Sequence, residues 1–130
     1  MNTFVDKLAS IEKLLSTQNG SFWLFALVER AESPEKWDLL VAAPWLQEES
    51  RKSLDEIIEI VGDKLGETEL LQLSRIIVLN PENPVVQHLT SAFGHEHAFH
   101  YVENTMINGM EISRAIIITS MRPEDNLAIT

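Results

Sequence analysis

The spacing of apolar residues predicts three amphipathic helices. Intervals of three or four residues separate apolar positions within 4–15, 54–65 and 85–93, which is the period of a helix with one buried side. The first helix is expected to end at Asn19-Gly20, and the second to run from about Leu46 to Leu65. Each helix therefore needs another element to cover its apolar side.

Five further segments read as strands. The stretches 21–31, 37–43 and 74–80 carry apolar residues at consecutive positions, which is typical of strands covered on both faces. A short turn with Pro34 joins the first two, so we expect an antiparallel hairpin. The last two strands flank Asn108-Gly109, a strong signal for a tight hairpin turn.

Together these elements predict one α+β domain over residues 1–121. The order is helix, strand, strand, helix, strand, helix, strand, strand. That order suits a sheet of about five strands, mostly antiparallel, with the three helices mainly on one face. Residues 122–130 are expected to form a loosely ordered tail.

The last hairpin permits a prediction of register. If Asn108 and Gly109 are the two loop residues, Glu103 lies opposite Arg114 and Tyr101 opposite Ile116. Strict alternation would place all four on the core face, with Glu103 and Arg114 forming a cross-strand ion pair. Two interpretations stay open, a pair at the rim of the sheet and a partly buried pair at a cleft or interface.

The charge of the chain argues against several partners. Twenty acidic residues and ten basic residues give a formal net charge of −10. Nucleic acids and anionic membranes attract clustered Lys and Arg, and this sequence has no such cluster, so we expect neither as a partner. A basic protein partner, or mimicry of nucleic acid, stays open.

The chain contains no cysteine, which excludes disulfides and thiolate chemistry. We expect a cytoplasmic protein, because the first residues also lack the basic and apolar regions of a signal peptide. The longest apolar run, 22–28, is too short to cross a bilayer.

Histidines provide the one candidate metal site. His95 and His97 share a face if the segment is extended, and imidazole is a common zinc ligand. His100 would point to the opposite face, so the ligand set would need a distant partner. The alternative is a polar connection that is rich in histidine.

Two tryptophans are candidate contact residues. Trp37 and Trp45 bracket the second strand, and tryptophan is enriched at protein contacts because its ring buries a large area. The alternative places both at the rim of the core.

No catalytic motif stands out in the sequence, so the favoured hypothesis is a non-enzymatic protein-binding or adaptor module that self-associates and needs no cofactor. Its candidate contact residues are Trp37, Trp45, Glu103 and Arg114. The alternative hypothesis is a small metal-binding protein, or a metal-assisted enzyme, built on His95 and His97.

Overall fold

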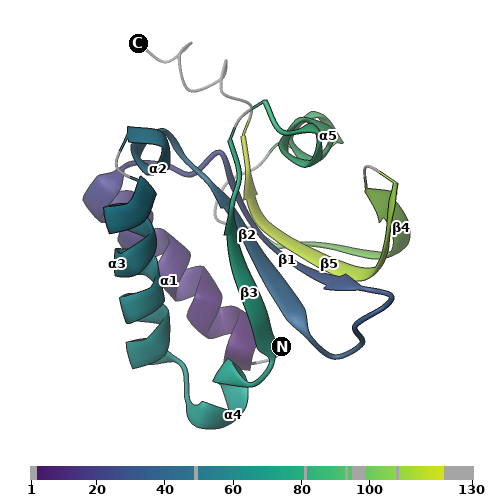
Figure 1. Cartoon of the computed structure of the whole chain (residues 1–130), viewed down its shortest axis with the longest axis horizontal. Helices are drawn as coiled ribbons and strands as arrows, with labels where there is room; N and C mark the ends of the chain where they lie inside the picture. Colours follow the sequence, from purple (N-terminus) through teal and green to yellow (C-terminus); the bar gives the residue numbers. More distant parts are fainter. Residues whose placement is uncertain are drawn as a thin grey trace.

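The computed structural model describes residues 3–48, 50–80, 82–92, 94, 99–107 and 109–121 (Figure 1). The tail predicted for 122–130 lies outside the described residues. The described elements are, in chain order, α1 (Thr3–Asn19), β1 (Leu24–Arg30), β2 (Trp37–Ala42), α2 (Pro44–Glu48), α3 (Ser50–Lys64), α4 (Glu67–Leu70), β3 (Leu73–Val78), α5 (Pro84–Ala92), β4 (His100–Ile107) and β5 (Met110–Ser120).

The five strands form one sheet in the order β3-β2-β1-β5-β4. The predicted α+β class and the five-stranded sheet are confirmed, but the sheet is mixed. β1 pairs antiparallel with β2 and β5, and β4 pairs antiparallel with β5, whereas β2 and β3 are parallel. In the chain, helices α2, α3 and α4 connect β2 to β3. A long connection of this kind allows two neighbouring strands to run in the same direction.

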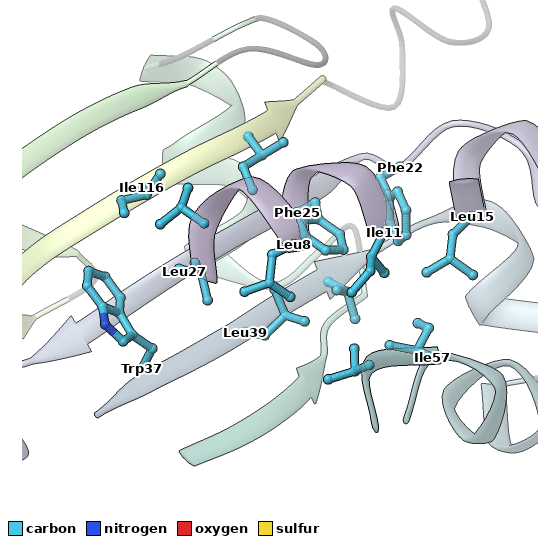
Figure 2. Close-up of a cluster of buried hydrophobic side chains, with 14 of the residues drawn as sticks. Leu8, Ile11, Leu15, Phe22, Phe25, Leu27, Trp37, Leu39, Ile57 and Ile116 are labelled. Atoms are coloured by element: carbon cyan, nitrogen blue, oxygen red, sulfur yellow. The ribbon is translucent and has the colours of Figure 1, made fainter. Parts of the chain in front are cut away.

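Helices cover both faces of the sheet. α1 and α3 pack on one face, and α5 lies on the other (Figure 1). The predicted apolar side of α1 is buried, with Leu8, Ile11 and Leu15 inside the larger cluster (Figure 2). We call this the α1 face, and the opposite one the α5 face. Burial from both sides explains why the central strands are apolar at consecutive positions.

Five helices are described where three were predicted. The helix expected from 46 to 65 is divided into α2 and α3, and α4 is an additional short turn. The Ser53 hydroxyl donates to the Trp45 carbonyl across the junction, at 3.4 Å. In a straight helix these residues would stand about 12 Å apart along the axis, so the chain must bend between them. The Glu69 carboxylate accepts the Gly66 N–H at 2.8 Å and so caps α4.

The register predicted for the last hairpin is confirmed, whereas its alternation is wrong. Glu103 lies opposite Arg114, but Ile112 packs on the α5 face while Ile116 packs on the α1 face. The cause is a bulge, because the register between β1 and β5 shifts by one residue between Glu29 and Arg30. Asn104, on the neighbouring strand β4, has a left-handed φ of 49°.

Candidate functional site

An ion pair between a buried carboxylate and a partly exposed guanidinium lies at one end of the α1 face. The Arg114 guanidinium donates through Nε and Nη2 to the two carboxylate oxygens of Glu29, each at 2.8 Å. The same guanidinium stacks over the Trp37 ring, with 4.9 Å from Cζ to the ring centroid. Glu29 and Trp37 are buried, but 39% of the Arg114 side chain is exposed. We call these three residues the Arg114 cluster.

Strand order brings the three residues together. Glu29 on β1 is the direct partner of Arg114 on β5. On the other side of β1, Val28 lies opposite Asp38, so Glu29 and Trp37 follow at the next position of the hairpin. Because β1 stands between β2 and β5, one row across the sheet holds a carboxylate, a guanidinium and an indole. Figure 2 shows Trp37 at the end of the apolar cluster, beyond Leu27.

Electrostatics keep both members of the pair charged. Hydrogen bonds from Arg114 lower the pKa of Glu29 below its ordinary value of 4.5, against the opposing effect of burial. The backbone N–H of Glu35 also donates to Glu29, and Glu35 adopts a left-handed φ of 65° in the turn after β1. Glu29 in turn raises the pKa of Arg114. The guanidinium is therefore fixed in place with part of its surface open to solvent.

Glu103 is not the ion partner of Arg114. It is the cross-strand neighbour on β4, as predicted, but its side chain is exposed, while the bidentate bond goes to Glu29 on the other side of β5. Arg114 therefore has a glutamate opposite it on each neighbouring strand, Glu29 on β1 and Glu103 on β4. The buried one, Glu29, accepts both hydrogen bonds. The predicted cross-strand ion pair was therefore assigned to the wrong neighbour.

Large apolar side chains are exposed on β4 and directly before it. Phe99, Tyr101 and Met106 are 47%, 51% and 55% exposed, and we call them the β4 patch. Tyr101 lies opposite Ile116, which belongs to the α1-face cluster, so the Tyr101 ring points to the same face as Arg114. Tyr101 also contributes to the raised pKa of Arg114. Tyr101 and the guanidinium therefore lie next to each other on this surface.

The structure separates the second predicted tryptophan from this surface. Trp45 lies on α2, beyond the far end of β2 from Trp37. Its indole N–H donates to the Gly20 carbonyl at 2.9 Å, and its ring meets Phe22 edge to face at 5.1 Å. Trp45 thus fixes the turn after α1.

The histidines of the predicted metal site, His95 and His97, lie outside the described residues. Among the residues that are described, no group of three or more His, Asp or Glu side chains is placed to hold a metal ion.

Two buried carboxylates, Glu29 and Asp38, were not predicted as site residues from the sequence. Glu29 was read as part of a buried strand, and its pairing with Arg114 depends on the neighbouring position of β1 and β5. On the α5 face, buried Asp38 accepts from Arg30 at 2.9 Å and from Arg75 at 2.7 Å. We call these three residues the Asp38 cluster. The one signal in the sequence was a carboxylate inside an otherwise apolar strand.

Comparison of the chain with protein-family models, curated proteins and solved structures gives no match. None of the described helices has the length and apolar character needed to cross a membrane.

Proposed function

We propose that this protein is a non-enzymatic protein-binding module that self-associates through the β4 patch and Arg114. The observation that supports this proposal is the exposure of Phe99, Tyr101 and Met106 along an edge strand, with Tyr101 next to a guanidinium that is already held in place. Tryptophan, tyrosine and arginine are the residues that most often dominate the binding energy of protein interfaces. We propose a cytoplasmic location for this module, because the absence of cysteine suits a reducing compartment.

Arg114 suits an interface because its side chain has little conformational freedom left to lose when a partner binds. Ordering a free, rotamer-rich side chain costs about 0.5–1.5 kcal/mol on binding. The bidentate bond to Glu29 and the stacking on Trp37 impose that order within the folded monomer. Its exposed part can therefore contact a partner at a lower entropic cost than a free surface arginine.

A second copy of the chain is the partner that this surface fits best. β4 is an edge strand, with β5 as its sheet neighbour, and exposed edge strands tend to pair with one another. A two-fold axis beside β4 would bring the β4 patch of each copy against the other. Exposed Glu103 and half-exposed Arg114 share this surface, so opposite charges can meet across such an axis.

Sedimentation equilibrium at tens of micromolar protein tests the proposal. We expect wild-type protein to be dimeric or larger, and Tyr101→Glu to sediment as a 14.7 kDa monomer because it places a carboxylate in the apolar contact. Ile58→Glu is the matched control, because Ile58 is 49% exposed but lies on α3. It should remain associated. A wild-type monomer, or a Tyr101→Glu variant that associates as wild type does, would refute the proposal.

A further inference from the structure

The opposite edge of the sheet carries a separate apolar groove. β3 is the edge strand on this side, and α3 and α4 flank it. The groove between them has a volume of about 250 Å³. We call it the β3 groove. Its lining residues are Ile58, Val61, Gly62, Leu70, Leu73, Ser74, Arg75 and Ile76.

The backbone of β3 favours a partner in extended conformation. β2 pairs with one side of this strand, and in the described part of the chain no strand pairs with its other side. Alternate N–H and C=O groups of an edge strand point outward, where an added strand can bond to them. An extended segment is therefore the shape that this edge can hydrogen-bond along its length.

The groove provides space for side chains of such a segment. Alternate residues of a strand added to β3 would point to the α1 face, directly into the groove. Ile58 and Leu70 are exposed side chains of this lining. Gly62 leaves open space on α3, since no atom outside its chain neighbours and the nearby backbone of its own helix lies within 4 Å of the position of its missing Cβ. Apolar side chains at alternate positions fit this lining.

The charges along the groove favour basic residues at the remaining positions. The acidic residues of α3 lie between positions 55 and 63, namely Asp55, Glu56, Glu59 and Asp63, and its basic residues are Arg51, Lys52 and Lys64. Asp55 and Glu59 are exposed, and each stands three residues before a groove residue, Ile58 or Gly62, on the same side of the helix. Arg75 adds little net positive charge, because Asp38 pairs with it at 2.7 Å and Glu32 pairs with Arg30, the other guanidinium bonded to Asp38.

We propose that the β3 groove binds an extended segment of another protein in which apolar and basic residues alternate, and that this segment adds a sixth strand beside β3. The net charge of −10 would attract such a segment and repel an acidic one. This site lies on the edge opposite the β4 patch, so it does not depend on self-association.

Fluorescence anisotropy with a labelled seven-residue peptide of alternating lysine and valine tests this proposal. Two variants at the same position make the test specific. Gly62→Phe should fill this open space and weaken binding by about ten-fold or more, while Gly62→Ala should bind as wild type does. Both variants should fold, because the Cβ meets open space and both residues are better helix formers than glycine.

Two further peptides examine the chemistry. A peptide of alternating glutamate and valine should bind more weakly than the lysine–valine peptide because its charge is negative. A peptide of alternating lysine and proline should also bind more weakly, because proline has no N–H and half of the backbone donors are missing. Equal binding of all three peptides, no binding of the lysine–valine peptide, or equal affinity for wild type and Gly62→Phe would overturn the proposal. If Gly62→Phe changes the sedimentation of the protein while Tyr101→Glu does not, the groove holds a second copy and this inference is wrong, as is the assignment of self-association to the β4 patch.

Discussion

Glu29 and Asp38 are neighbouring buried carboxylates on opposite faces of the same hairpin, and the structure neutralises them in different ways. Glu29 has one guanidinium, from Arg114, which bonds to both of its oxygens. Asp38 has two, since Arg30 and Arg75 approach it from strands on either side. If Arg114 is lost, no second guanidinium remains for Glu29. If Arg30 or Arg75 is lost, Asp38 keeps the other one, so the cations of the Asp38 cluster are redundant.

The difference also bears on what each cluster can do. Arg114 stands beside exposed Tyr101 of the β4 patch, so its charge lies at a candidate interface. The Asp38 cluster joins β1, β2 and β3 across the sheet and holds the edge strand β3 in place. We therefore expect Arg114 to combine stability with binding, and the Asp38 cluster to contribute to stability.

The largest expected effect follows from Arg114→Met. It would leave the Glu29 carboxylate buried without its cation, and breaking a buried pair in this way costs about 3–5 kcal/mol. We expect a value near the lower limit, because Arg114 is partly exposed. Urea unfolding measures the loss, and Arg51→Met, at an exposed end of α3, is the control.

A double variant separates the charge from the packing. In Glu29→Met/Arg114→Met no buried charge remains unpaired, so it should be more stable than Arg114→Met alone. A double variant that is less stable than the single one would show that Glu29 has another essential role.

A smaller effect is expected for Arg75→Met. Asp38 would keep its bond to Arg30, so we expect a loss of about 1 kcal/mol, the size of one ordinary hydrogen bond. Arg30→Met should behave alike, and the double variant should lose more than the sum of the two. Equal losses for Arg75→Met and Arg114→Met would contradict the redundancy of the Asp38 cluster.

The stability of the protein should depend on pH through Glu29. Its pKa is lowered in the folded state, so its contribution to the free energy of unfolding is complete above about pH 4.5 and is lost as pH falls through the folded-state pKa. Glu29→Gln should remove this dependence, and the difference in stability between wild type and variant should shrink in acid. Thermal unfolding between neutral and acidic pH measures it, and a constant difference would show that Glu29 does not carry the effect.

The smallest effect is expected for Glu103→Gln. Glu103 is exposed, and Arg114 is held by Glu29, so the change in stability should lie within about 0.5 kcal/mol. A double-mutant cycle with Arg114→Met should give a coupling energy near zero. A coupling above about 1 kcal/mol would mean that Glu103 shares the cation after all.

Most of the strands and helices, and the pairing within both hairpins, could be predicted from local patterns in the chain. The helical period at Phe4, Leu8, Ile11 and Leu15 predicted α1 and its buried side, and the Asn108-Gly109 signal predicted the register that places Glu103 opposite Arg114. Both are local properties, since the side-chain period of a helix and the loop length of a hairpin depend on residues close together in the chain.

Trp37 and Arg114 were candidates from the sequence, but tertiary packing brought them together and added Glu29. Glu29 and Arg114 are 85 residues apart in sequence, and they meet because β1 and β5 are neighbours in the sheet. The bulge opposite Glu29 and Arg30 then set which face Ile112 and Arg114 occupy, against the simple alternation of the strand. Strand order and bulges result from the packing of the whole sheet between helices, and no local spacing of residues encodes them.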